Sequence, residues 1–296
     1  MRQRMTLQRP DRNGPCWCGS GIKYKHCHQP VEDRILAYQL RGYEVPTRKL
    51  LKTPADVEGI KKSAAINMAA LDAVAEKIRA GMSTEEINTI VNDVTYGMGG
   101  IPADLNYQGY PKSVCTSVND QVCHGIPATD VILREGDIIN VDCSTILDGY
   151  FSDSSRMFII GQTTPEKEAL VRIAKECMEE GLKQVIPWHT LGDMGSAVNR
   201  HAKENGCTIV REIGGHGCGN AFHEDPWVSY VSSPGTEMLM VPGMVFTIEP
   251  MVNLGKAAIR EDKKNGWTIY TADGMPSAQW EIEVLVTETG HEVLCW

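Results

Sequence analysis

The sequence predicts an α+β fold made of two similar halves, preceded by a small separate module. Helical stretches with clear capping signals alternate with short apolar strands. The order of helices, an irregular segment and strands occurs twice, about 110 residues apart, although the sequence itself does not repeat. The first 28 residues carry a cysteine cluster and a net charge of +5, whereas the rest of the chain carries −14. The predicted organisation is a module at 1–30, a linker at 31–52 and a main domain at 53–296.

Residues 137–161 predict a β-hairpin that carries two carboxylates. An Asp-Gly turn signal at 148–149 separates two apolar runs. With that turn, Asp142 lies opposite Ser155, and Asp153 shares its face at about 7–8 Å. Two inward carboxylates at this distance repel each other unless a cation lies between them. The hairpin therefore indicates a metal site; the alternative is a pair of surface aspartates near a turn.

The N-terminal module contains a second set of metal-binding residue types. Cys16, Cys18, Cys27 and His28 have the spacing C-x-C-x8-C-H. Three cysteines and one histidine are a usual tetrahedral zinc complement, and four protein ligands leave no position open for catalysis. The alternative is four unrelated side chains in a disordered tail. The stretch PCWCGSGIKYKHCH resembles the SEC-C zinc motif, which implies a structural zinc ion and a docking role.

The composition of the chain predicts a cytoplasmic location. Hydrophobic residues make up 42%, enough for a sizeable core, but no apolar run approaches the ~20 residues that span a bilayer. The N-terminus has charge without an apolar signal segment. In a reducing compartment the ten cysteines are explained by burial or by metal binding.

Four helices are predicted in the main domain. Capping signals and apolar residues at spacings of three and four predict helices over 53–81, 83–97, 164–182 and 190–206. These residues are expected to form the core. By contrast, 29–52 has few periodic apolar positions and is expected to be a linker with one short helix.

The segment 103–127 differs from the helices because glycine and proline interrupt it. Aromatic and thiol side chains beside such turns suit the wall of a pocket. The residues of interest here are Tyr107, Tyr110, Cys115 and His124. Taken alone, His124 fits a structural histidine slightly better than a functional one.

The second half supplies matching polar residues. His216 and His223 lie in a glycine-rich stretch, and Glu249 and Glu281 interrupt apolar strands predicted over 244–252 and 278–287. Together with the two hairpin aspartates, His216 and the glutamates make an oxygen-rich set with one nitrogen. That mixture suits a pair of divalent ions such as Mn, Fe or Co. Four buried carboxylates that are each independently hydrogen-bonded would be the alternative.

These residues carry a family resemblance. The segments VCHGIP, VDCSTILDGYFSD, GGHGCGNAFHEDP, FTIEPM and SAQWE occur in this order. With them, the chain from Thr53 to its end resembles the type I methionine aminopeptidases. Only 26 positions separate His223 from Glu249, so the helical insertion typical of type II members is absent. The resemblance implies the pita-bread fold: two pseudo-symmetric halves with antiparallel sheet inside and helices outside.

The resemblance also implies a role for each site residue. The ligands of two divalent ions (Co, Mn, Fe or Zn) would be Asp142, Asp153, His216, Glu249 and Glu281. Catalysis would involve His124, His223 and Glu249, and a hydroxide bridging the two ions would attack the peptide carbonyl. The methionine pocket would contain Tyr107, Tyr110, Cys115, His124, Phe222, His223 and Trp267. The implied activity is removal of the initiator methionine from nascent chains whose second residue is small.

Two positions depart from the family pattern. Asp104 stands where many bacterial members have a pocket cysteine, and we expect its carboxylate to turn away from the pocket or the pocket rim to differ. Ile282 follows Glu281 where histidine is common. Because that histidine is not a ligand, we expect catalysis to persist with weaker metal affinity.

Other functions remain open at this point. A proline-directed relative such as a prolidase or aminopeptidase P would share the metal ligands but not the aromatic and thiol pocket. A pita-bread protein without activity would be a binding protein, and a chain defined by its zinc module would be an adaptor. For the module, the basic charge and the SEC-C resemblance indicate the ribosome or a translocation-related protein as partner.

Overall fold

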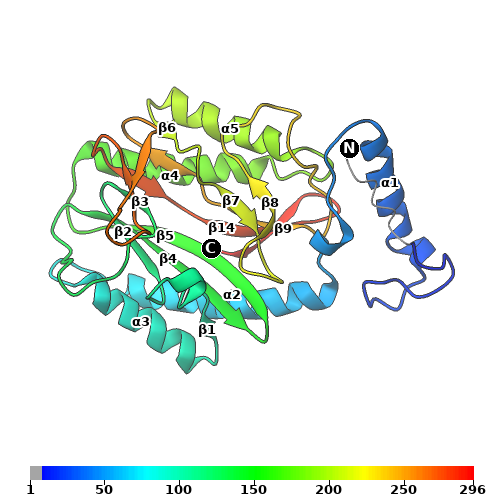
Figure 1. The fold of residues 1–296 in the computed structure, drawn as a ribbon, viewed down its shortest axis with the longest axis horizontal. Helices are drawn as coiled ribbons and strands as arrows, with labels where there is room; N and C mark the ends of the chain where they lie inside the picture. The colour runs from blue at the N-terminus through cyan, green and yellow to red at the C-terminus, as the bar shows by residue number, and fades with distance from the viewer. Residues whose placement is uncertain (1–8) are drawn as a thin grey trace.

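The structure, a computed structural model, describes residues 9–296 and shows a two-part body with a smaller N-terminal unit at one end (Figure 1). The α-helices of this range are α1 Gln29–Leu40, α2 Pro54–Ala75, α3 Thr84–Gly97, α4 Pro165–Lys183 and α5 Leu191–Glu204. Short 3-10 helices are η1 Tyr24–His26, η2 Arg48–Leu50 and η3 Tyr107–Gly109. Arg2 and Arg4, which contribute to the predicted basic module, lie outside the described residues.

The strands form four antiparallel sheets. The first half contains β1 Ile101–Pro102, β2 Cys115–Val118, β3 Gln121–Cys123, β4 Ile138–Leu147 and β5 Tyr150–Ile159. The second half contains β6 Thr208–Ile209, β7 Gly215–Gly217, β8 Glu224–Val228, β9 Val245–Ile248, β10 Met251–Asn253, β11 Ile259–Glu261, β12 Ile269–Thr271, β13 Ser277–Gln279, β14 Ile282–Val286 and β15 His291–Cys295. The sheets run β1-β4-β2 with β5 beside β4, β13-β10-β6, β11-β12-β3, and β15-β14-β9-β7-β8.

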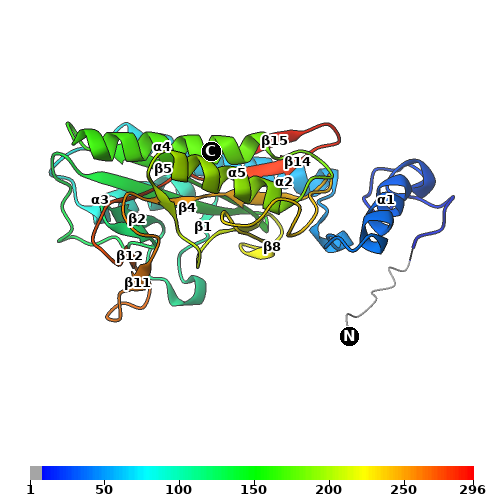
Figure 2. The same ribbon diagram turned by 90° about the horizontal axis from the view of Figure 1, so that it is seen from above.

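The helices cover one side of the sheets. α2 packs on β4 and β5, and α4 packs on β9, β10 and β13. In the view from above, α2, α4 and α5 lie on one side and the β11–β12 segment protrudes on the other (Figure 2). The arrangement confirms the predicted α+β architecture with sheet inside and helices outside. No helix in residues 9–296 combines the length and the apolar character needed to cross a membrane.

The helix starts agree with the capping signals. Thr53 and Ser83 each accept a hydrogen bond from the backbone three residues on, in reciprocal capping boxes. The end of α2 differs from the prediction, because the helix stops at Ala75 and not at Gly81. The Gly81 N–H donates to the Leu133 carbonyl at 2.8 Å, so the backbone here pairs with a neighbouring segment and leaves the helix.

The central hairpin has the predicted register, but two other predicted strands are not continuous. Leu147 pairs with Tyr150 and Asp142 with Ser155, as expected. The strands predicted over 244–252 and 278–287 are each broken in two. The breaks fall at Glu249-Pro250 and at Trp280-Glu281, where the chain passes between the five-stranded sheet and the sheet β13-β10-β6. Pro250 lacks the N–H that a continuous ladder would need.

The stretch expected to be a linker packs against the body. α1 begins directly after His28, and Ile35 on this helix joins the largest core cluster. Tyr38 stacks on Trp188 with ring centroids 5.8 Å apart. The Glu44 carbonyl accepts a hydrogen bond from Leu239 N–H at 2.9 Å. Aromatic and aliphatic side chains thus give this stretch a fixed place that its weak periodicity did not indicate.

Candidate active site

A cavity of about 630 Å³ lies between the two halves of the body. Every residue predicted for the catalytic metal site or the substrate pocket lines it. From the first half come Tyr107, Tyr110, Cys115, His124, Asp142 and Asp153, and from the second half His216, Phe222, His223, Glu249, Trp267 and Glu281. The fold therefore assembles in one place residues that are up to 174 positions apart in the sequence.

The hairpin presents its two carboxylates to this cavity. Asp142 on β4 and Asp153 on β5 project from one face of the hairpin, because Asp142 pairs with Ser155 and Asp153 with Ser144. The Ser144 hydroxyl donates to Asp153 Oδ1 at 2.9 Å and fixes the orientation of that carboxylate. Its second oxygen faces the residues of the other half.

Three groups from different segments of the chain converge on one point. Ligand atoms of Asp153, His216 and Glu281 all lie within 4.8 Å of one another. His216 Nε2 is 3.5 Å from Asp153 Oδ2 and 3.6 Å from Glu249 Oε1. Carboxylate oxygens and an imidazole nitrogen at these separations can hold a divalent cation.

Glu249 is oriented by neighbours that the sequence analysis missed. The Thr247 hydroxyl donates to Glu249 Oε1 at 2.8 Å, and Gln279 Nε2 donates to Oε2 at 3.1 Å. The Glu249 N–H donates to the Tyr230 hydroxyl at 2.7 Å. Thr247 precedes Glu249 by two positions, the spacing of neighbours on one face of a strand. That spacing could have indicated Thr247 from the sequence alone.

Burial makes the carboxylates hard to ionise together. Desolvation raises the pKa of Asp142 to about 7. Desolvation and the charge of Asp142 raise the pKa of Glu249 to about 8. Burial, with the negative charges of neighbouring carboxylates, raises the pKa of Asp153 and of Glu281 well above the ordinary range. A bound cation would remove this penalty, so the donor set fits a divalent metal.

His216 is held as a neutral imidazole with one nitrogen free for the site. Burial lowers the pKa of His216 to about 3. Its Nδ1 lies 3.0 Å from the Gly217 carbonyl, which can accept only if Nδ1 carries the proton. Nε2 is then the unprotonated nitrogen, and it points toward Asp153 and Glu249.

His223 and His124 line the same cavity as these ligand atoms. The ring of His223 lies 4.1 Å from that of His216, and its Nδ1 is 3.0 Å from the Tyr107 hydroxyl. His124 also lines the cavity, with its ring centroid 6.1 Å from that of Trp267. Burial lowers the pKa of His124 to about 4 and also lowers the pKa of His223. Both are therefore neutral hydrogen-bonding groups near pH 7.

The cavity wall also carries aromatic and thiol side chains, beside polar residues such as Gln108, Glu224 and Asp225. Tyr107 contacts Phe222 edge to face at 4.8 Å, and Tyr110 contacts Trp267 in the same way at 5.1 Å. Cys115 is buried beside them. Of the two alternatives expected for Asp104, the first is wrong: the residue does not turn away but lines this wall and is buried.

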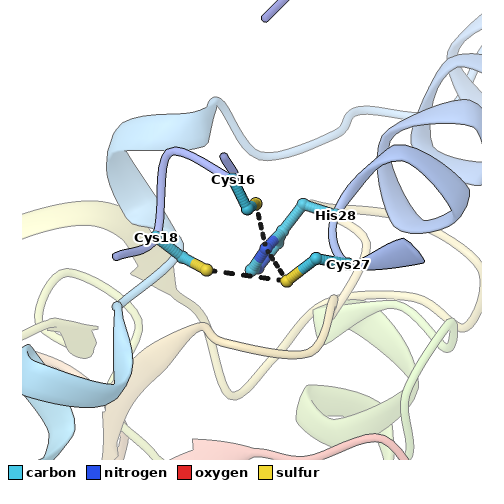
Figure 3. A group of neighbouring side chains, drawn as sticks. All are labelled: Cys16, Cys18, Cys27 and His28. Atoms are coloured by element: carbon cyan, nitrogen blue, oxygen red, sulfur yellow. Dashed lines mark hydrogen bonds between the residues drawn. The ribbon is translucent and has the colours of Figure 1, made fainter. Parts of the chain in front are cut away.

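The N-terminal module brings its four predicted residues together (Figure 3). His28 Nδ1 lies 3.2 Å from Cys16 Sγ and 3.2 Å from Cys27 Sγ, and Cys18 Sγ lies 3.6 Å from Cys27 Sγ. The four ligand atoms lie within 4.8 Å of one another. This group can hold one tetrahedral metal ion.

Glu32 joins the module to the body. This buried carboxylate accepts hydrogen bonds from Trp17 Nε1 at 2.9 Å and from the Tyr24 hydroxyl. It also forms an ion pair with Arg48, with Nη2 and Oε1 2.8 Å apart. Trp17 and Tyr24 belong to the module, and Arg48 lies in η2 next to the main domain. The module is therefore tied to the chain that follows by charge-assisted hydrogen bonds.

Comparison with known proteins agrees with the fold and the site. Residues 58–288 match metallopeptidase family M24, and residues 12–30 match the SEC-C motif. The fold and the converging carboxylates thus define an M24 metallopeptidase.

Relatives narrow the class further. A methionine aminopeptidase of Chlamydia pneumoniae is 38% identical over 286 residues, 96% of this chain and 98% of that protein. The Escherichia coli K12 methionine aminopeptidase is 42% identical over 245 residues, 82% of this chain and 92% of that protein. The chain therefore belongs to the methionine aminopeptidases of family M24. The crystal structure of the Rickettsia prowazekii methionine aminopeptidase has a TM-score of 0.81 at 35% identity, covering 83% of this chain and 99% of that one.

Prolidase structures share the fold alone. The Pyrococcus furiosus prolidase reaches a TM-score of 0.68 at 23% identity and covers 83% of this chain but 65% of its own.

Proposed function

We propose that the cavity is the active site of a metal-dependent aminopeptidase that releases methionine from the N-terminus of polypeptides. The observation that carries this proposal is the convergence of Asp153, His216 and Glu281 in a cavity that is also lined by aromatic side chains and the Cys115 thiol. The first feature can hold the metal of a hydrolase, and the second suits a flexible thioether side chain.

The metal ligands would be the five residues predicted from the sequence. Asp142, Asp153, His216, Glu249 and Glu281 would together hold two divalent ions, with Asp153 and Glu281 shared between them. The raised pKa of the carboxylates and the free Nε2 of His216 support this assignment. When bound, such ions lower the pKa of water and polarise a carbonyl.

The protein groups around the metal site would position the peptide and move protons. Glu249 would accept a proton from the attacking water and transfer it to the leaving amine, and Thr247 and Gln279 keep its two oxygens in place. His223, whose Nδ1 lies 3.0 Å from the Tyr107 hydroxyl, would donate to the negative charge that develops on the peptide oxygen. His124, beside Trp267 in the same cavity, would bind the substrate backbone.

The substrate would be a nascent chain with a small second residue such as Gly, Ala or Ser, encountered in the cytoplasm. A direct test is methionine release from Met-Gly, Met-Ala, Met-Ser and Met-Lys peptides, with Leu-Ala, Lys-Ala and Ala-Pro as competitors, across Mn, Fe, Co and Zn. The proposal expects fastest release from the first three. Faster hydrolysis of Ala-Pro would favour a proline-directed enzyme, and no hydrolysis with any metal would favour a binding protein.

For the N-terminal module we propose a structural zinc ion bound by Cys16, Cys18, Cys27 and His28, and a docking role. The four ligand atoms would complete the coordination sphere, so the ion could not activate water. Lys23 and Lys25, which follow Gly19 and Gly21, are part of the basic charge of the module and suit an anionic surface such as ribosomal RNA.

Co-sedimentation with ribosomes at rising salt tests the partner. A Lys23→Ala/Lys25→Ala variant should bind less, with an affinity that depends less on salt, while it hydrolyses Met-Ala as before. If its binding equals that of the unchanged protein, the partner is recognised through other residues, such as those of a translocation-related protein interface.

A further inference from the structure

Trp227 lies at the opening of the cavity. The cavity-lining residues that are exposed to solvent are Gln108, His223, Asp225 and Trp227, so these four mark where the cavity meets water. Trp227 is the apolar member of this group, and it is 50% exposed. A large aromatic side chain in this position can contact the part of a bound molecule that extends out of the cavity.

The indole of Trp227 also differs from the other tryptophans in its surroundings. The chain contains six tryptophans. The other five each have a hydrogen-bond acceptor, an aromatic ring or a cation beside the indole, and they are Trp17, Trp188, Trp267, Trp280 and Trp296. Within residues 9–296 the Trp227 side chain has no such partner. Interactions of this kind within the described chain therefore do not account for a tryptophan at this position.

The position of the indole is set by the sheet. β8 is the outer strand of the five-stranded sheet, and Trp227 pairs there with His216 of β7. Residues directly opposite each other on antiparallel strands share one face, with Cβ atoms about 4.5–5.5 Å apart. The six-membered ring of the indole lies against Gly214, where an added Cβ would be 3.1 Å from Trp227 Cζ2. The indole is therefore supported by backbone on one side while half of its residue surface stays exposed.

The path of a peptide through the site follows from the proposed function. The methionine side chain would lie in the aromatic pocket, and the carbonyl to be attacked would lie at the metal site beside His216. An extended chain advances about 3.3–3.6 Å per residue, so the third residue lies about 7 Å beyond the first. That distance suits contact with a side chain next to His216. Because the second residue is small, the third is the first whose side chain can extend to the indole.

We propose that Trp227 is a specificity-determining residue that contacts the side chain of the third residue of the substrate and favours an aromatic or large aliphatic residue there over glycine. This inference rests on the proposed function and extends its specificity by one position. An apolar third side chain would cover exposed indole surface, and an aromatic one would also gain a ring contact. Because this contact lies away from the bond that breaks, it would be equal in the bound substrate and in the transition state. It should therefore act on KM more than on kcat.

The test compares two tetrapeptide amides, Met-Ala-Phe-Ser and Met-Ala-Gly-Ser, with the full-length, metal-loaded protein. We expect kcat/KM to be about three- to tenfold higher for the phenylalanine peptide, mainly through a lower KM. This preference should fall below about twofold in Trp227→Ala and be kept in Trp227→Phe. The matched control is Trp296→Ala, which removes a tryptophan that is 60% exposed and does not line the cavity. That variant should keep the preference.

Several results would overturn the inference. Equal kcat/KM values for the two peptides in the unchanged protein would do so, as would a preference that persists in Trp227→Ala. Faster hydrolysis of Met-Ala-Lys-Ser amide than of the phenylalanine peptide would show that the carboxylates of Glu224 and Asp225 select the third residue in place of the indole. If Trp227→Ala fails to fold, Trp227→Gln takes its place with the same expectation. Failure of the unchanged protein to release methionine from any of these peptides would instead overturn the proposed function.

Discussion

Ser155 and Glu281 exchange both of their backbone hydrogen bonds, at 3.3 and 3.2 Å. Ser155 lies on β5 in the first half, and Glu281 lies between β13 and β14 in the second. This single bridge places the Glu281 carboxylate beside Asp153, which is two residues from Ser155 on the same face of β5. The metal site therefore depends on the contact between the halves, and neither half contains it alone.

The first prediction concerns the stability of the metal-free protein at rising pH. Raised pKa values in the folded state, about 7 for Asp142 and about 8 for Glu249, mean that folding favours their protonated forms. Their contribution to stability is present at low pH and is lost as pH rises through those values. Because the histidines, with an ordinary pKa of about 6.5, are largely neutral in both states above about pH 7.5, we expect Tm to fall between pH 7.5 and 8.5. Added Mn²⁺ should reduce the fall, as measured by calorimetry.

Glu283 provides an internal control for that experiment. It is fully buried on β14, neither of its oxygens has a hydrogen-bond partner among the residues that the structure describes, and burial raises its pKa to about 8. Glu283→Gln should weaken the pH dependence that remains when metal is present. A metal-free protein whose Tm rises from pH 7.5 to 8.5 would contradict this account of the carboxylates.

The second prediction concerns Lys52, whose ammonium group is buried and forms an ion pair with Glu224. Lys52→Met would leave Glu224 without its cation, at a cost of about 3 kcal/mol. Glu224 follows His223, so methionine release should also fall. The matched control is Lys61→Met, whose pair with Glu292 is exposed and contributes about 0.5 kcal/mol or less. Equal unfolding free energies for the two variants, measured in urea, would contradict the assignment.

The third prediction separates the N-terminal module from the chemistry. Cys18→Ser removes one ligand atom, so the protein should retain about one zinc ion fewer per chain, and the module should loosen because zinc supplies its folding energy. We expect hydrolysis of Met-Ala to change less than twofold. Zinc analysis and limited proteolysis within 9–28 provide the measurements. Loss of hydrolysis in a variant with an intact main domain would place the module in the active site.

Much of the site could be predicted from the sequence because its carboxylates occur within otherwise apolar stretches. Asp142, Asp153 and Glu249 are carboxylates among strand-forming apolar residues, and the Asp-Gly turn fixes the register of the hairpin. The signals for Cys16 and its partners were equally local, since their spacing alone indicates a metal.

The rest could not be predicted, because it depends on contacts between distant segments. The strand breaks at Glu249 and Glu281 occur where the chain passes from one sheet to another. The apolar pattern of each run gives little indication of such a break. Because carboxylates are costly in such a pocket, Asp104 was expected to turn away or the pocket rim to differ. In the structure Asp104 stays at the wall, where its carboxylate accepts a hydrogen bond from the Ser144 N–H. A short helix was expected in the stretch that holds α1, but its packing against the body was not, because its contacts, such as Tyr38 on Trp188, are with residues far along the chain.

The most direct test of the central claim compares two histidine variants of the full-length protein. His216→Ala removes the nitrogen that lies within 3.6 Å of two carboxylates in the cavity, whereas His201→Ala removes a histidine that pairs with Glu176 outside it. We expect His216→Ala to lower kcat/KM for methionine release from Met-Ala at least about 1,000-fold after metal titration, while it stays folded, and His201→Ala to leave it nearly unchanged. Near-normal methionine release by a folded His216→Ala protein would contradict the assignment of this cavity as the active site.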